Sequence, residues 1–217
     1  MNVKRRARWI QAACFAIGIC LLTYPAVIFV YGKGYQMYLA FVFHPEVPVP
    51  SKAVHASSVA AGMPIAKLEI PRLKFSVVVL EGIADSILKR GVGHVPETAL
   101  PGKPGNVGIA AHRDTFFRSL KDIRDGDLIR LRTYDGVFDY RVEWTRVVKP
   151  AAVDVLDVTD APSLTLVTCY PFYYVGSAPD RFIVRARQLL DQYEADFSLD
   201  ETPPGRSVDT VAVVRLP

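Results

Sequence analysis

The chain has 217 residues, of which 50% are apolar, and its mean hydropathy is +0.19. This length allows one domain with a sizeable core, and the positive hydropathy indicates a membrane segment. The formal net charge is +4, but four of the 26 basic residues precede the first apolar run, which leaves 22 bases against 22 acids. The excess of basic residues therefore lies in the N-terminal flank, and the net positive charge gives no support to nucleic-acid binding.

Residues 9–31 form an apolar run without a charged side chain. As a helix, this run is long enough to span a hydrocarbon core of about 30 Å. It exceeds the apolar core of a cleavable signal peptide, which has roughly 7–15 residues, and it lacks the polar face of a buried globular helix. We therefore expect residues 1–31 to be a basic flank and an uncleaved, single-pass anchor in the cell membrane. The positive-inside rule leaves the N-terminus in the cytoplasm and places the following domain outside.

By composition and hydrophobic pattern, the rest of the chain divides into a linker, a β-rich domain and a tail. Residues 32–64 form a juxtamembrane segment, in which 32–43 extend the helix or lie at the interface and 44–64 form a Pro/Ser/Ala-rich spacer. From residue 65 to 192, short β-like runs alternate with turn residues, and 84–90 and 116–123 resemble short helical turns. Seven or eight short strands favour a closed or nearly closed β-barrel. Residues 193–217 read as a loose tail that contains a candidate edge strand.

Cys169 is the one cysteine outside the apolar run, because Cys14 and Cys20 both lie within it. It has no intrachain partner in the external domain, so it is a reactive thiol, an intermolecular partner or a buried inert thiol. It follows the predicted strand 163–168, at a strand end where a side chain is accessible.

Arg181 begins the next predicted strand, after a loop of about eleven residues. Antiparallel pairing of the two strands would bring Arg181 and Cys169 to the same edge. Phe182, Val184 and Ala186 alternate onto the expected core face, which leaves Arg181 on the other face. The alternative is a solvated arginine at a strand start.

His112 is the favoured histidine, because it ends an apolar strand in "NVGIAAHRD". The competing residue, His94, lies in a glycine-flanked segment that reads as a turn. Asp114 is close to His112 in sequence, but a solvated turn role is favoured for it.

A cysteine, a histidine and an arginine together suit acyl transfer. A free thiol has a pKa of about 8.5, and a nearby cation favours the nucleophilic thiolate. An imidazolium can protonate a departing amine, and a guanidinium can stabilise the tetrahedral oxyanion. The backbone N–H of Tyr170 is a candidate second oxyanion donor.

Several motifs carry a resemblance to a known family. "TLVTC" at 165–169 resembles the sortase TLxTC signature, and "GIAAHRD" at 108–114 resembles the segment with the catalytic histidine. Residues 168–186 are most similar to class D sortases, and further matching segments keep the family order over roughly 65–190. Ala111 stands where the family often has glycine.

The resemblance implies a mainly β fold, an eight-stranded sortase barrel with short helices, preceded here by the transmembrane helix. It implies Cys169 as nucleophile, His112 as general acid and base, Arg181 as oxyanion and positioning group, and Thr168 and Tyr170 in substrate or oxyanion binding. Similar enzymes cut an LPxT-type sorting signal of a secreted protein after its Thr. They pass the thioester-bound fragment to an amine of a peptidoglycan precursor or of a lysine on another surface protein. Residues 149–163 would help form the signal groove.

No cofactor is expected, and no metal, since "KDIRDGD" reads as a charged turn rather than a calcium site. Two other exported enzyme types fit less well. L,D-transpeptidases place their cysteine in a Ser-x-Gly-Cys-x-Arg context, and papain-like hydrolases place theirs at a helix N-terminus. A membrane-tethered β-module that only binds peptides is the alternative outside catalysis.

Overall fold

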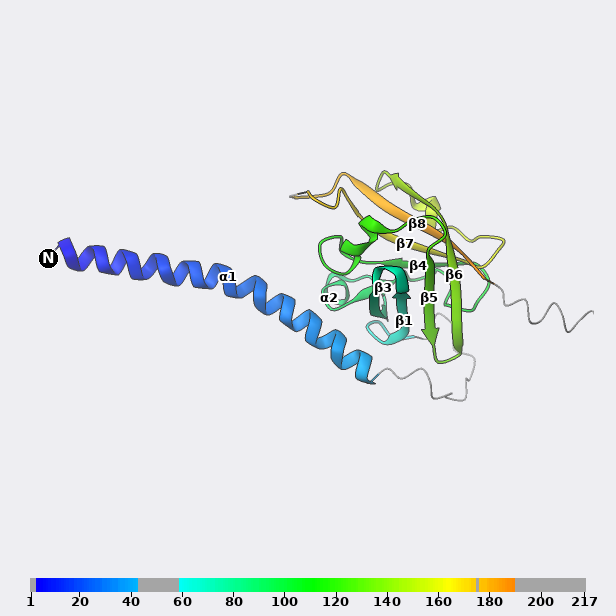
Figure 1. The fold of residues 1–217 in the computed structure, drawn as a ribbon, viewed down its shortest axis with the longest axis horizontal. Coiled ribbons are helices and arrows are strands. Elements are labelled where there is room, and N and C mark those ends of the chain that lie inside the picture. The colour runs from blue at the N-terminus through cyan, green and yellow to red at the C-terminus, as the bar shows by residue number, and fades with distance from the viewer. Residues whose placement is uncertain (1–2, 43–58, 175, 190–217) are drawn as a thin grey trace, which may run out of the picture.

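The computed structural model describes residues 3–42, 59–174 and 176–189. In these ranges eight strands close into a barrel in the order β1-β2-β3-β4-β7-β8-β6-β5 (Figure 1). Neighbouring strands are antiparallel, except for the parallel pairs β2–β3 and β4–β7. The strands are β1 (Pro64–Ile70), β2 (Phe75–Glu81), β3 (Val92–His94), β4 (Asn106–Ala110), β5 (Leu128–Thr133), β6 (Gly136–Val148), β7 (Ser163–Tyr170) and β8 (Asp180–Gln188).

The helical elements are short, apart from the first. They are α1 (Val3–Val42), η2 (Pro71–Leu73), α2 (Asp85–Leu88), η3 (Phe116–Asp122) and η4 (Val153–Leu156). The two helical turns predicted from the sequence correspond to α2 and η3. The predicted mainly β barrel of eight strands with few short helices is confirmed.

The barrel forms because apolar residues alternate along its strands and point to one interior. In β1, for example, Ala66, Leu68 and Ile70 are fully buried. Burying each large apolar side chain contributes about 1.5–3 kcal/mol relative to exposure. The largest buried side chains are Tyr140, Phe117, Leu68, Ile70, Leu80, Ile109, Leu120, Ile129, Leu131, Leu164, Leu166 and Ile183.

Strand β3 corrects the sequence analysis, which interpreted the segment around His94 as a turn. Val92 pairs with Val79 of β2, and Gly93 pairs with Ala110 of β4. A Cβ on Gly93 would lie 2.2 Å from the Gly82 carbonyl oxygen, so only glycine fits this close backbone approach. Glycine here serves strand packing rather than chain reversal.

Helix α1 continues to Val42, and its C-terminal part packs against the barrel. The Gln36 amide accepts from Val78 N (2.9 Å) and donates to Arg90 O (2.8 Å). Leu39 joins a small buried cluster with Val78, Leu80 and Ile87.

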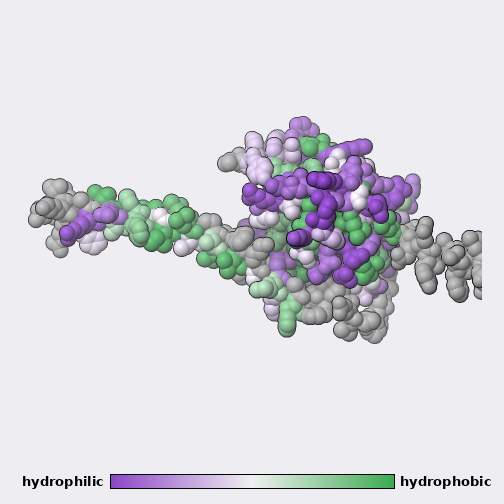
Figure 2. All heavy atoms as spheres, viewed as in Figure 1, coloured by the Kyte–Doolittle hydropathy of each residue, from purple (hydrophilic) through white to green (hydrophobic). Residues whose placement is uncertain are grey.

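Further towards the N-terminus, α1 carries many exposed apolar side chains, which Figure 2 shows in green beside the more hydrophilic visible face of the barrel. Within the described ranges no helix is long and apolar enough to cross a membrane, so the transmembrane helix expected at residues 9–31 is not shown. Most of the expected spacer and the whole tail at 193–217 lie outside the described residues.

Candidate active site

Cys169 and Arg181 face each other across the β7–β8 ladder. Their Cα atoms are register partners in this antiparallel pair, as the sequence predicted for the two strands. Strand β7 extends to Tyr170, so Cys169 lies inside the strand rather than just after it. Leu164 and Leu166 point into the core, and Cys169 therefore belongs to the outward-facing side of the strand. Cys169 and Arg181 are both partly exposed.

His112 follows β4, which lies on the other side of β7. Ala110 pairs with Val167 in the parallel β4–β7 ladder, and Ala111 N donates to Val167 O (3.2 Å). Continuing this register by two residues places His112, which lies beyond the end of β4, next to Cys169 of β7. The His112 side chain is 39% exposed and thus accessible. Strands β7 and β8 carry Cys169 and Arg181, and His112 follows the neighbouring strand β4, so the three predicted catalytic residues lie at one end of the barrel.

Thr168 and Tyr170 flank Cys169 and make different contacts. The Thr168 side chain is buried, and its Oγ1 donates to Ala111 O (2.8 Å). This bond fixes the residue that precedes His112. The Tyr170 ring packs against Phe172 and Phe182, with ring centroids at 5.9 and 6.2 Å.

His94, the competing histidine, is 1% exposed and has both ring nitrogens occupied. Nδ1 is 2.8 Å from Glu81 Oε2, and Nε2 is 3.0 Å from both Ala99 O and Thr98 Oγ1. Thr98 Oγ1 in turn accepts from Gly108 N in β4. These bonds tie β2, β3 and β4 together, so His94 has a structural role.

Asp85 is a neighbour of His112 that the sequence analysis did not find. Its Oδ1 is 3.9 Å from His112 Nε2, and its Oδ2 pairs with Lys89. The hydrogen bond from Lys89 lowers the pKa of the Asp85 carboxyl, and the charges of Lys89 and His112 lower it further. Asp85 lies at the start of α2, far from His112 in sequence, and only the closed barrel brings them together.

Basic side chains hold the β7–β8 loop against the segment after His112. Arg113 Nη2 donates to Tyr174 O (2.8 Å) and Gly176 O (3.0 Å). Lys121 Nζ donates to the Tyr173 hydroxyl (2.9 Å), and this bond lowers the pKa of the phenol. The loop next to Cys169 is therefore anchored to η3. The sequence showed only scattered basic and aromatic residues, without their pairing.

The loop that contains η4 lies on the same outward face of β4 and β7. Asn106 Nδ2 donates to Val155 O (3.2 Å), and Thr165 Oγ1 donates to Asn106 Oδ1 (2.7 Å). Val153 and Val158 are 68% and 87% exposed, so this loop presents apolar side chains to solvent. The family resemblance implied that residues 149–163, which include this loop, help form the signal groove.

The "KDIRDGD" segment, residues 121–127, forms a charged turn in which the last aspartate, Asp127, already has hydrogen-bond partners. Asp127 Oδ2 accepts from Arg72 Nη2 (2.6 Å) and from Arg124 N (2.8 Å). The hydrogen bond from Arg72 lowers the pKa of Asp127. Among the described residues, no three His, Cys, Asp or Glu side chains are grouped to hold a metal ion.

The arrangement around Cys169 has the parts that acyl transfer requires. The thiol can attack a carbonyl from the open face of β7, and the neighbouring histidine can move a proton. The planar guanidinium of Arg181 belongs to the residue directly across the ladder from Cys169. Its Nη1 bonds to Asp180 O (3.0 Å), which orients the side chain.

Comparison with known proteins identifies the class to which this barrel and site belong. A family model described as a Sortase domain matches residues 68–189, which is more than half of the chain. The chain belongs to the sortase family, and the resemblance predicted from its motifs is confirmed.

Class D members are among the relatives. The chain is 34% identical over 123 residues to Sortase D of Bacillus subtilis (strain 168), a match that covers 56% of this chain and 62% of that protein. It is 28% identical over 131 residues to Sortase A of Streptococcus agalactiae, covering 51% of that protein. The chain thus spans between half and two thirds of these curated relatives.

Solved structures share the fold. A Clostridium perfringens Sortase D5 transpeptidase aligns with a TM-score of 0.61 at 28% identity, covering 74% of this chain and 99% of that one. A sortase C of Clostridium perfringens, solved with the C-terminal cell wall sorting motif, aligns with a TM-score of 0.56 at 28% identity. That alignment covers 61% of this chain and 74% of the other.

Proposed function

We propose that this chain is a cysteine transpeptidase that cleaves an LPxT-type sorting signal after its Thr and transfers the protein to an amine. The observation that carries this proposal is the pairing of Cys169 with Arg181, beside strand β4, whose end at Ala110 is followed closely by His112. Membership of the sortase family supports it.

The reaction has two steps: the first forms a thioester on Cys169, and the second breaks it. The thiolate attacks the Thr carbonyl carbon, the peptide C–N bond breaks, and His112 gives a proton to the departing amine. An acceptor amine then attacks the thioester, His112 takes its proton, and the C–S bond breaks to restore the thiolate. Arg181 and the backbone N–H of Tyr170 stabilise the oxyanion in both steps, and Thr168 holds the strand in place.

The substrates follow from this chemistry and from the η4 loop. Exposed Val153 and Val158 supply apolar contacts for the Leu and Pro side chains of the signal. The acceptor is an amine of a peptidoglycan precursor or a lysine of another surface protein. Both are primary amines that can attack a thioester.

The test uses the full chain with Cys14→Ala and Cys20→Ala, which leaves Cys169 as its one thiol. We expect incubation with a library of LPxT-containing peptides to give a mass increase on Cys169 that equals the fragment ending at Thr. The matched control replaces the Thr of each peptide by Val. Peptides that bind without any adduct would instead identify a non-catalytic peptide-binding module.

We also propose that the N-terminus lies in the cytoplasm and the barrel outside, with residues 9–31 of α1 held in the cell membrane. This proposal is supported by the uncharged sequence 9–31, by the basic residues before it, and by the exposed apolar side chains of α1. We expect a reporter fused after Pro217 to be active only outside the cytoplasm. Activity of a cytoplasm-dependent reporter at the same position would contradict this orientation.

A further inference from the structure

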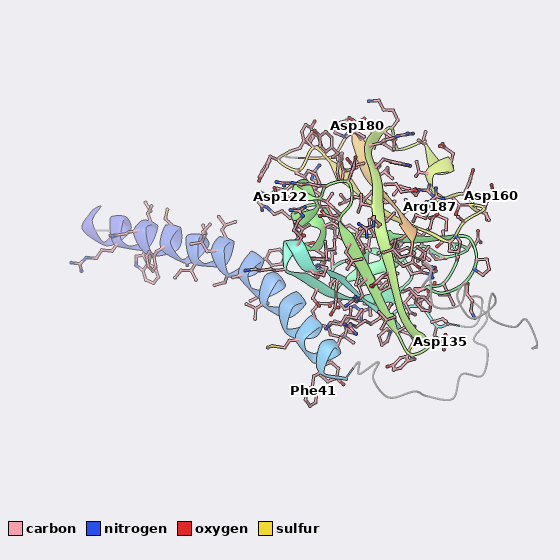
Figure 3. The ribbon with its side chains drawn as sticks, turned by 45° about the vertical axis from the view of Figure 1, so that its right-hand side comes forward. Phe41, Asp122, Asp135, Asp160, Asp180 and Arg187 are labelled. Atoms are coloured by element: carbon pink, nitrogen blue, oxygen red, sulfur yellow. The ribbon has the colours of Figure 1, made fainter. Side chains whose placement is uncertain are left out.

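A pocket of about 500 Å³ opens on the outer face of β6 and β8, away from Cys169. Its strand residues are Glu143 and Trp144 on β6, Ser163 on β7, and Arg185 and Arg187 on β8, and residues 158–161 close one side. Figure 3 shows Arg187 and Asp160 close to each other, with Asp180 at the far end of β8.

The pocket and the proposed active site lie at different points of the same face. Thr165 pairs with Arg185, four residues along the ladder from the pair of Cys169 and Arg181. At about 3.3 Å per residue, this separation is roughly 13 Å. A group bound in the pocket is therefore too far away to react with the thiol.

Arg185 is the unusual residue of this pocket, because it is a nearly buried cation with few partners. Its side chain is 9% exposed, and Nη2 donates to Val155 O (2.7 Å). Its Nε has no hydrogen-bond partner, and burial lowers the pKa of the guanidinium. Among the described residues no carboxylate forms an ion pair with Arg185, since Glu143 bonds to Arg187.

Trp144 gives this cation an aromatic neighbour. It is the register neighbour of Arg185 across the β6–β8 ladder, and the guanidinium carbon lies 5.5 Å from its ring centroid. The guanidinium of Arg146 lies 4.3 Å from the same ring. Cation–π contacts orient the guanidinium, and the nearby Glu143 carboxylate interacts with its charge without forming an ion pair with it.

We propose that this pocket binds a carboxylate, with Arg185 as the charged contact and Trp144 packed beside it. The planar fork of a guanidinium matches a carboxylate in two parallel hydrogen bonds. Glu143 and Asp160 in the lining repel a doubly charged phosphate more strongly than a singly charged carboxylate. The same two acids can accept N–H donors, as a peptide that carries an acidic side chain would supply.

The fluorescence of Trp144 reports binding directly. The chain contains two tryptophans, and Trp9 lies on α1, so a Trp9→Phe background isolates Trp144. We expect a saturable change on titration with acetate, or with the capped peptide N-acetyl-Ala-Glu-Ala-amide, at constant ionic strength. Tighter binding of acetate identifies a free carboxylate as the ligand, and tighter binding of the peptide identifies an acidic side chain. Acetamide and the corresponding Gln peptide are the matched neutral probes.

Arg185→Gln removes the charge but keeps a donor for Val155 O, and we expect it to weaken binding by about tenfold or more. Arg141→Gln makes the same change at an exposed β6 residue outside the pocket lining, and should bind as the parent does. The absence of a saturable response in the parent overturns the proposal, as does tighter binding of phosphate than of either carboxylate. An unchanged affinity of Arg185→Gln also overturns it. Because binding is read without turnover, this result is independent of the thioester chemistry.

Discussion

Replacing Cys169 by alanine is expected to lower kcat for transpeptidation by on the order of 10⁴-fold or more, as the loss of other enzyme nucleophiles does. Alanine removes the atom that forms the thioester, and no other described cysteine is near it, because Cys14 and Cys20 lie on α1. The measurement is the rate of product formation from an LPxT peptide and an excess of a primary amine.

The double variant Cys14→Ala/Cys20→Ala is the matched control for the Cys169 result. It removes two thiols far along the chain from the barrel and should retain the parent rate. Cys169 is partly exposed and is not counted among the buried core residues, so its replacement should leave the folded barrel intact, as circular dichroism can verify. Retention of the parent rate by Cys169→Ala would falsify the proposed mechanism.

Arg181→Lys is expected to lower kcat by about 10²–10³-fold, the usual cost of losing one oxyanion donor. Lysine keeps the positive charge but loses the planar fork and the second donor nitrogen. The shape of the side chain matters at this position because Arg181 is directly opposite Cys169 in the β7–β8 register. The rate with an LPxT peptide at saturating concentration separates this effect from weaker substrate binding.

Arg141→Lys is the matched control for the arginine result. It makes the same chemical change at an exposed position of β6, away from Cys169. It should keep the parent rate. If Arg181→Lys also keeps the parent rate, Arg181 serves the β7–β8 ladder alone and has no part in the reaction.

The strands were predictable where apolar and polar residues alternate with period two. Strand β8 shows this, since Phe182, Val184 and Ala186 pack towards the core, and its register with β7 followed from a single connecting loop. The predicted positions of Cys169 and Arg181 rested on this same pattern. The period-two alternation was therefore sufficient to predict the barrel strands and the relative positions of Cys169 and Arg181.

Contacts between distant segments were not predictable in the same way. Strand β3 has only three residues, and its glycine is explained by the Gly82 carbonyl that it approaches. The proximity of Asp85 to His112, and the bonds from Arg113 to the β7–β8 loop, depend on closure of the barrel. None of these leaves a periodic signal in the sequence, because each joins single residues from separate elements.

The packing of α1 on the barrel links two parts of the molecule that would otherwise move independently. Leu39 contacts the cluster that includes Ile87 of α2, and Asp85, two residues earlier in α2, lies beside His112. A rotation of the helix about its junction with the barrel would press on β2, through Val78, and on Ile87 of α2, close to the surroundings of the imidazole. The angle at which the helix leaves the barrel thus bears on the packing of α2, the element that places Asp85 beside His112.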